Sequence, residues 1–292
     1  MIHPTLSAPA GPLLLLVCCG ALGGCTGLAV PECVLVDENT GLLYVSNIDA
    51  AEGQYWADDG AGFISRLKAD LSVEQLRWRD STRRHPINAP KGMCIVDGVL
   101  WVADNRRVHR FPLDGDGVLP PFEVEGAQQL NDMATDDKSP FVSDTATGKV
   151  HRLDPAGRKI IKGPPGVNGI TFLGPKMFAV SWDLHEVYEL DPAGKEEPRP
   201  FGLASHFVNL DGIEVLDDGT FIVSDFTGNK ICSISPDRKT VTKLLDVESP
   251  ADIGLDRRNG ILYIPQFMKD KVVMLKLSTP KGIARVKESG AR

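Results

Sequence analysis

Residues 210–225 read LDGIEVLDDGTFIVSD, and this stretch contains the pattern that decides the fold. A polar residue, Asp211, stands two positions before a hydrophobic anchor, Ile213. A turn rich in Asp and Gly follows, and a second apolar run ends in Val-Ser-Asp at Asp225. Two short runs rich in Val, Ile and Phe, separated by turn residues, are typical of a β-hairpin. The stretch therefore predicts two antiparallel strands.

Five further copies of this pattern occur along the chain. They are PECVLVDENTGLLYVSN from Pro31, PKGMCIVDGVLWVAD from Pro90, LNDMATDDKSPFVSD from Leu130, VNGITFLGPKMFAVSW from Val167 and PADIGLDRRNGILYIPQ from Pro250. The six anchors are Val34, Met93, Met133, Ile170, Ile213 and Ile253, so the repeat is close to 40 residues after a first interval of 59. A third apolar run follows each copy, which is typical of one four-stranded blade per repeat. We predict an all-β fold, a six-bladed β-propeller, that occupies residues 31–292 as one domain.

The sequence leaves one strand of this ring open. The sixth copy has clear strands as far as Leu277, but its outermost strand needs a further segment. Either residues 282–286 or the stretch before Pro31 can supply it. In the second case the two ends of the chain are joined in one blade.

The first 24 residues differ in composition from the rest of the chain. They carry no Asp, Glu, Lys or Arg and contain an apolar run from Leu13 to Leu22, which is typical of a secretory signal peptide. The segment leads into the motif LGGC, which resembles the lipobox of bacterial lipoproteins and whose cysteine is Cys25. We expect an exported protein, in the periplasm or at the cell surface, anchored to a membrane by lipidated Cys25. An ordinary cleaved signal is the alternative.

The overall charge and the remaining cysteines limit the function. The formal net charge of −7 disfavours nucleic acid as a partner and broad electrostatic attachment to anionic lipids. Cys33, Cys94 and Cys232 fall in different copies of the repeat. We expect them to be buried thiols and not part of a disulfide framework.

One position of the repeat differs from copy to copy. Two residues before the anchors stand, in order, Glu32, Lys91, Asn131, Asn168, Asp211 and Ala251, which we call the inner ring. Because side chains alternate along a strand, these residues should point the same way in every blade and converge on the central axis. Glu32, Asn168 and Asp211 offer hard oxygen donors, which suit a divalent cation. The ion can be Ca²⁺, Mg²⁺, Mn²⁺ or Zn²⁺.

A second polar position recurs at the ends of the second apolar runs. It is occupied by Asn47, Asp104, Asp144, Trp182, Asp225 and Gln266. The three aspartates follow Val-Ala or Val-Ser, and this regularity favours a structural role. A carboxylate here can accept hydrogen bonds from the backbone of the next loop. We predict that these aspartates cap loops and take no part in catalysis.

The long first interval comes from an insertion at residues 49–62. It follows the second run of the first copy, so it lies at the same rim as the inner ring. Tyr55 and Trp56 can form a lid over the pocket and contact a substrate, and Gly53 and Gly60 would allow this lid to move. Packing of the two rings against a neighbouring blade is the alternative.

These residues together resemble the senescence marker protein/gluconolactonase family, in its branch of bacterial extracytoplasmic propellers. The resemblance covers residues 31 to about 277 and rests on Pro31-Glu32, Asn131-Asp132, Asn168-Gly169, Leu210-Asp211-Gly212 and the Val-Ser-Asp strand ends. It implies that Glu32, Asn168 and Asp211 hold a divalent cation and that Asn131 lies beside a small-molecule substrate. It further implies hydrolysis of a sugar lactone or related ester, with the cation polarising the carbonyl and Asp211 as candidate catalytic base.

Two positions depart from the pattern of that family. The residues before Asn131 read Gln128-Gln129-Leu130, where its sugar lactonases carry an arginine, and Lys91 stands in the inner ring. Lys91 either binds a substrate carboxylate or phosphate, or replaces the cation by pairing with Glu32. The alternative to a hydrolase is therefore a non-catalytic propeller lipoprotein that binds a small ligand or a protein, with a Glu32–Lys91 pair in place of the metal.

Overall fold

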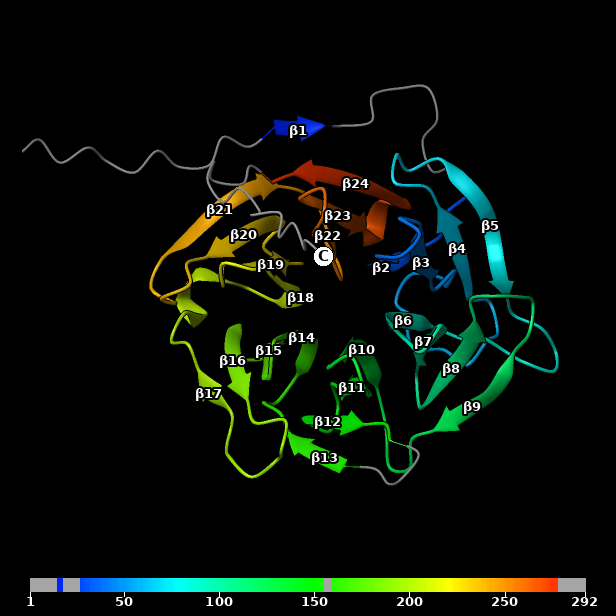
Figure 1. The fold of residues 1–292 in the computed structure, drawn as a ribbon, viewed down its shortest axis with the longest axis horizontal. Helices are drawn as coiled ribbons and strands as arrows, with labels where there is room; N and C mark the ends of the chain where they lie inside the picture. The colour runs from blue at the N-terminus through cyan, green and yellow to red at the C-terminus, as the bar shows by residue number, and fades with distance from the viewer. Residues whose placement is uncertain (1–14, 18–26, 155–158, 278–292) are drawn as a thin grey trace, which may run out of the picture.

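Six four-stranded antiparallel sheets form a ring in the computed structural model, which describes residues 15–17, 27–154 and 159–277 (Figure 1). The first five sheets, blades 1 to 5, each use four consecutive strands, of which the first is innermost. Blade 1 contains β2 (Pro31–Val36), β3 (Leu43–Asn47), β4 (Phe63–Leu67) and β5 (Val73–Asp80); blade 2 contains β6 (Pro90–Val96), β7 (Val99–Asp104), β8 (Arg107–Pro112) and β9 (Leu119–Glu123); blade 3 contains β10 (Leu130–Thr135), β11 (Pro140–Asp144), β12 (Lys149–Arg152) and β13 (Lys159–Lys162); blade 4 contains β14 (Val167–Leu173), β15 (Lys176–Ser181), β16 (Glu186–Leu190) and β17 (Arg199–Pro200); blade 5 contains β18 (Leu210–Val215), β19 (Phe221–Asp225), β20 (Lys230–Ile234) and β21 (Val241–Asp246). The predicted all-β six-bladed propeller is confirmed.

Blade 6 takes its strands from both ends of the chain. It contains β22 (Gly254–Asp256), β23 (Ile261–Gln266), β24 (Lys271–Lys276) and, at its outer edge, β1 (Leu15–Val17), which pairs antiparallel with β24. The outermost strand thus comes from the stretch before Pro31. Residues 282–286, the other candidate, lie outside the described residues, as do Cys25 and all of residues 1–24 except β1. Export and lipidation of Cys25 therefore stay predictions.

The first and last blades also join at the centre of the ring. The backbone N–H of Asp252 donates to the carbonyl oxygen of Glu32 at 2.9 Å, and the N–H of Val34 donates to the carbonyl oxygen of Asp252 at 3.3 Å. These bonds form a parallel bridge between Cys33 and Asp252. The inner strand of blade 1 is therefore fixed against blade 6, and the channel at the axis is closed on all sides.

The hydrophobic core is divided into layers between neighbouring blades. The six anchors Val34, Met93, Met133, Ile170, Ile213 and Ile253 are buried, and each lies in a different hydrophobic cluster. Burying one such side chain stabilises a fold by about 2 kcal/mol. The cysteines Cys33, Cys94 and Cys232 are free and buried in these layers, as predicted. Each anchor thus joins its blade to a neighbour.

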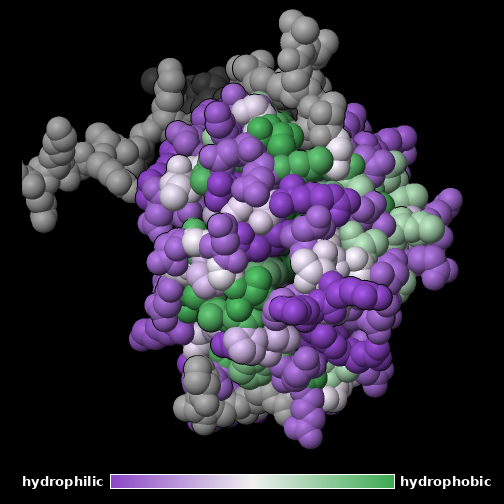
Figure 2. Space-filling view, turned by 90° about the vertical axis from the view of Figure 1, so that its right-hand side faces the viewer, coloured by the Kyte–Doolittle hydropathy of each residue, from purple (hydrophilic) through white to green (hydrophobic). Residues whose placement is uncertain are grey.

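The outer surface and the helices add little to this core. The side of the ring that carries blades 1 and 2 is covered mostly by hydrophilic residues, with smaller hydrophobic patches between them (Figure 2). The helices of the described residues are the 3-10 turns η1 (Ala204–His206) and η2 (Phe267–Lys269). Neither is long or apolar enough to cross a membrane.

A bulge in the inner strands of blades 1 to 5 sets the direction of the inner ring. The pairing register shifts between Pro31 and Val34 in blade 1, and at the equivalent place in the next four blades. A β-bulge bends a strand and re-aims its side chains. The residue after the ring position is often glycine because the next inner strand comes close. A Cβ on Gly169 would lie 2.4 Å from the carbonyl oxygen of Asp211.

Candidate functional site

A cavity of about 1350 Å³ opens at the end of the channel where the inner strands begin. It brings together every residue that the sequence predicts for the substrate and metal sites, which are Glu32, Tyr55, Trp56, Lys91, Asn131, Asn168 and Asp211. The five polar members of the inner ring are between 3% and 6% exposed. Ala251, the sixth member, is fully buried and packs in a cluster with Phe267. The inner ring therefore surrounds the floor of one cavity.

Three oxygen atoms of the inner ring lack a partner. Oε2 of Glu32, Oδ1 of Asn168 and Oδ1 of Asp211 are buried and accept no hydrogen bond from the residues that the structure describes. The side chain of Asn168 also forms a hydrogen bond with the carboxylate of Asp211. A buried polar atom without a partner costs about 1–3 kcal/mol, so such atoms call for a ligand or bound water.

These oxygens fit a divalent cation in their chemistry. Two carboxylates and one amide are hard donors, and three protein ligands would leave coordination positions open for water or substrate. Among the described residues, no three or more His, Cys, Asp and Glu side chains are grouped to hold a metal. A cation at this site would therefore depend on the amide oxygen of Asn168 as its third protein ligand.

Burial controls the protonation of the inner ring. It raises the pKa of Glu32 well above the usual value, an effect that Lys91 opposes and Asp211 reinforces. It likewise raises the pKa of Asp211 to about 7, against the opposing charge of Lys91 and the hydrogen bond from Asn168. Burial also lowers the pKa of Lys91, while the nearby carboxylates act in the opposite direction. A ligand cation would favour the ionised carboxylates.

The ammonium group of Lys91 contacts the inserted loop. Its Nζ donates to the carbonyl oxygen of Tyr55 at 3.2 Å and lies 4.1 Å from the ring centroid of Trp56. Such a contact between a cation and an aromatic face is attractive. No ion pair within 4.0 Å joins Lys91 to Glu32 in the described part of the chain, so the direct pair of the non-catalytic alternative is not formed. Lys91 acts on the carboxylates only through space.

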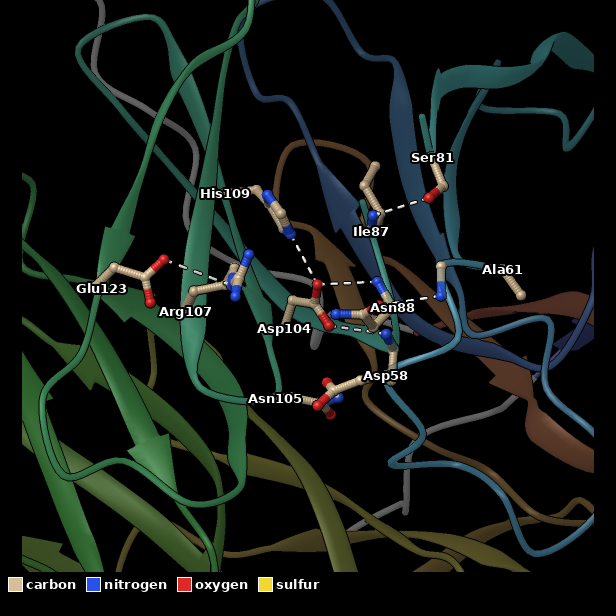
Figure 3. Close-up of polar contacts among 12 residues, drawn as sticks. Asp58, Ala61, Ser81, Ile87, Asn88, Asp104, Asn105, Arg107, His109 and Glu123 are labelled. Atoms are coloured by element: carbon tan, nitrogen blue, oxygen red, sulfur yellow. Dashed lines mark hydrogen bonds and ion pairs between the residues drawn. The ribbon is translucent and has the colours of Figure 1, made fainter. Parts of the chain in front are cut away.

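The inserted loop at residues 49–62 both packs on its neighbours and lines the cavity. The ring of Tyr55 meets that of Phe267 in blade 6 at a centroid distance of 4.8 Å. On the other side, Asp58 accepts from Nδ2 of Asn105 at 2.7 Å (Figure 3). Asp58 also pairs with Arg106 at 2.8 Å. The loop is therefore held by blades 2 and 6 while Tyr55 and Trp56 face the cavity. The ring of Tyr55 thus packs against a neighbouring blade, while a moving lid and contact with a substrate stay predictions.

The aspartates at the ends of the second strands have full sets of partners. Asp104 accepts from the backbone N–H groups of Asn88 and Ala89 at 2.9 and 2.8 Å and lies 2.8 Å from Nε2 of His109 (Figure 3). Burial alone would raise the pKa of Asp104, but these hydrogen bonds hold it below the usual value. Asp144 and Asp225 accept backbone N–H groups in the same way. Capping is confirmed.

Two details of the predicted capping position need correction. The donors come from the loop that precedes the blade, because that loop enters the inner strand beside the end of the second strand. In blade 4 the position belongs to Ser181, which pairs with Val167, and not to Trp182. Trp182 stands one residue later, at a place that Phe226 and Phe267 occupy in blades 5 and 6. The pattern of apolar and polar residues in the sequence does not define the last residue of a strand.

Two groups of residues at the channel were not predicted from the sequence. Trp182, Phe226 and Phe267 all line the cavity, and their shared place after the second strand was the signal that could have found them. Below the inner ring lie two further buried acids, Asp132 and Asp252. Burial raises the pKa of Asp132 to about 7. This second layer borders another cavity of about 570 Å³ at the opposite end of the channel.

Comparisons with known proteins reach as far as the fold. No family model and no curated protein matches this sequence. Among solved structures, the chain is similar to a catalytically inactive histidine-to-alanine variant of virginiamycin B lyase from Staphylococcus aureus with quinupristin, with a TM-score of 0.61, 14% identity and coverage of 91% of this chain and 99% of that one. A streptogramin B lyase structure gives a TM-score of 0.61 and 12% identity, over 91% of this chain and 98% of that one. At such identities the likeness shows the propeller fold alone, and the resemblance to the senescence marker protein/gluconolactonase family stays a prediction.

Proposed function

We propose that this chain is a divalent-cation-dependent hydrolase that opens a lactone or an ester at the mouth of the propeller channel. One observation carries the proposal. Glu32, Asn168 and Asp211 come from blades 1, 4 and 5 and present unpartnered oxygens to one cavity. A fold has no stability reason to bury three such atoms together, whereas a ligand site requires them.

Several residues of the chain would have separate roles in hydrolysis. A bound divalent cation would polarise the substrate carbonyl and favour ionisation of a water molecule. A bound cation would keep Asp211 ionised, and an ionised carboxylate at this place can accept a proton from that water. Lys91 places a positive charge at the same rim, which favours the negative charge that develops on the carbonyl oxygen. Asn131 lines the same cavity and would face the substrate.

A second candidate function is a non-catalytic propeller that binds a small ligand or a protein. The burial of Lys91 near two carboxylates favours it, because an ammonium group there can take the place of a cation. The two candidates differ in what happens when Lys91 is removed. A hydrolase would bind its cation more tightly, whereas the binding protein would lose stability.

A hydrolysis assay tests the first candidate. Lactones and esters are offered to chelator-treated protein, and proton release is followed before and after addition of Ca²⁺, Mg²⁺, Mn²⁺ or Zn²⁺. We expect turnover only with a cation, and its loss in Glu32→Gln but not in Glu52→Gln, a carboxylate that lines the cavity from the inserted loop. If the rate of hydrolysis is unchanged by the chelator and by Glu32→Gln, the proposal is contradicted.

We also propose that the enzyme works outside the cytoplasm, anchored through Cys25. The apolar N-terminal segment and its LGGC motif support this. Mass spectrometry of membrane-extracted protein is expected to find a lipidated N-terminal cysteine, and Cys25→Ser protein is expected in the soluble fraction. Membrane-bound Cys25→Ser protein would contradict the anchor.

A further inference from the structure

A continuous row of aromatic rings lines one half of the cavity. The ring centroids of Trp182 and Phe226 lie 5.4 Å apart, those of Phe226 and Phe267 5.5 Å, and those of Phe267 and Tyr55 4.8 Å. The first three residues follow the second strands of blades 4, 5 and 6, and Tyr55 comes from the inserted loop. We call these four residues the aromatic row. It continues around the mouth over four neighbouring blades.

The aromatic row lies next to Ala251, the one apolar residue of the inner ring. Ala251 of blade 6 belongs to the same apolar cluster as Phe267, Tyr55 and Phe226. Beyond the row, Leu184 and Met268 are large apolar side chains that are 41% and 48% exposed. Apolar groups that gather in and around a cavity mark a surface that binds apolar ligands. Apolar surface therefore runs from the floor of the mouth to its rim.

Three polar side chains of the opposite half, those of Asn131, Thr145 and Lys162, are already engaged within the protein. Nδ2 of Asn131 donates to Oγ1 of Thr145 at 3.2 Å, and that hydroxyl donates to the carbonyl oxygen of Val167 at 2.8 Å. Nζ of Lys162 lies 2.5 Å from the carboxylate of Glu197. A polyhydroxylated ligand would have to break such contacts to satisfy its own hydroxyls. An apolar ligand requires no such exchange.

We infer that the substrate is a lactone or ester that carries an aromatic ring or a comparably bulky apolar group, and not a polyhydroxylated sugar lactone. The inference rests on the proposed hydrolase function. The carbonyl would lie beside a cation held by the free oxygens of Glu32, Asn168 and Asp211, and the apolar group would pack against the aromatic row. Water adds to the carbonyl carbon and the carbon–oxygen single bond breaks, which yields a carboxylic acid and an alcohol. The cavity exceeds the range of about 300–1,000 Å³ that is usual for small ligands, so it has room for both parts.

A matched pair of substrates tests this inference. γ-Butyrolactone and its phenyl-substituted form share the reacting ring, and glucono-lactone supplies the hydroxylated comparison. Burial of a phenyl group is expected to raise kcat/KM about 100-fold over the unsubstituted lactone. Phe226→Ala should reduce this ratio to about tenfold or less, and Phe226→Leu should keep most of it. Phe172→Ala, a half-buried phenylalanine at the opposite end of the channel, should leave the ratio unchanged.

A binding measurement separates this inference from the proposed function. The lactams that correspond to the two butyrolactones resist hydrolysis, and their binding is followed by the fluorescence of Trp56 and Trp182. Tighter binding of the phenyl lactam, weakened by Phe226→Ala, supports the apolar substrate class even if no lactone is turned over, in which case the hydrolase proposal fails alone. Equal turnover of the two butyrolactones, or a preference for glucono-lactone, overturns the inference but agrees with the proposed hydrolase function. Equal binding of the two lactams also overturns the inference.

Discussion

Two sets of buried polar residues lie within the same blades and have opposite properties. At the ends of the second strands, Asp104 has its carboxylate oxygens filled by two backbone N–H groups and a histidine, and its pKa lies below the usual value. In the inner ring, Asp211 keeps one oxygen free, and burial raises its pKa to about 7. Both side chains are almost completely buried. The difference lies in their partners.

Residues that stabilise the fold therefore differ in their hydrogen bonding from residues that can bind a ligand. A carboxylate whose hydrogen bonds are complete is most stable when ionised, and its removal leaves donors without partners. A carboxylate with a free oxygen destabilises the folded protein until a cation or proton binds. The repeat contains both kinds, so acidity and burial alone do not identify a site.

The largest effect is expected from Asp211→Asn. The amide keeps the shape of the side chain but loses its charge, so we expect kcat/KM to fall about 1,000-fold, which corresponds to about 4 kcal/mol. The free energy of unfolding of chelator-treated protein should stay equal or rise, because a costly buried acid is removed. Urea denaturation measures the second effect. A strongly destabilised variant would place Asp211 with the structural aspartates.

Asp104→Ala should do the reverse. It leaves the N–H groups of Asn88 and Ala89 and the ring of His109 without their acceptor, and we expect a loss of about 3 kcal/mol in the free energy of unfolding. Cation affinity of the protein that remains folded should be unchanged. If urea denaturation shows less than about 1 kcal/mol of change, the assignment of Asp104 to the fold is wrong.

The pH dependence of stability gives an intermediate effect. The pKa of Asp132 is about 7 in the folded protein and close to 3.8 when unfolded, so the folded state binds more protons between these values. Its stabilising contribution is complete below the unfolded pKa and is lost as pH rises through about 7. In chelator-treated protein we expect a loss of about 2 kcal/mol between about pH 5 and pH 6.5 from this group. Asp132→Asn should flatten that slope in thermal unfolding, and an unchanged slope would contradict the account.

Replacing Lys91 should have a smaller effect and decides between the two candidate functions. Lys91→Met removes a positive charge near Glu32 and Asp211, so cation affinity is expected to rise about tenfold. The fluorescence of Trp56 should also change, since Nζ lies over its ring. Lys230→Met, on the outer part of blade 5, is the control. Loss of the folded state without any gain in affinity would favour the non-catalytic binding protein.

The smallest effect is expected from removing the first 26 residues. In the described part of that segment, the three residues of β1 pair with the outer edge of β24, far from the inner ring. We expect the free energy of unfolding to change by less than about 1 kcal/mol in urea denaturation. Cation affinity should be the same as in the full chain. A larger loss would mean that β1 is needed to close the ring.

The fold could be predicted from the sequence because the same pattern occurs six times, at a spacing close to 40 residues in all but the first interval. The anchors, from Val34 to Ile253, keep their place in every copy, since each must fill one layer between blades. The positions of Glu32, Asn168 and Asp211 followed from the same register. That one oxygen of each side chain lacks a hydrogen-bond partner could not be predicted. It depends on which groups three different blades bring close to these side chains. The contacts of Lys91 could not be predicted for the same reason: the loop that carries Tyr55 and Trp56 folds over it from another blade.

The aromatic row shows the same limit. Phe226 and Phe267 lie 41 residues apart in sequence and meet only because their blades are neighbours. The predicted end of the second strand in blade 4 lay one residue too late, at Trp182, which hid the shared aromatic place. Alignment of the copies by their pairing partners, available only from the structure, makes it visible.

Counting bound ions tests the central claim most directly. Chelator-treated protein is titrated with Ca²⁺, Mg²⁺, Mn²⁺ and Zn²⁺ in a calorimeter, beside Asp211→Asn and Asp183→Asn, the latter a carboxylate at the wall of the same cavity and outside the inner ring. The account predicts one tightly bound ion per chain for the wild type and for Asp183→Asn, and none for Asp211→Asn. A wild type that binds none of the four cations, or an Asp211→Asn protein that binds as the wild type does, would contradict it.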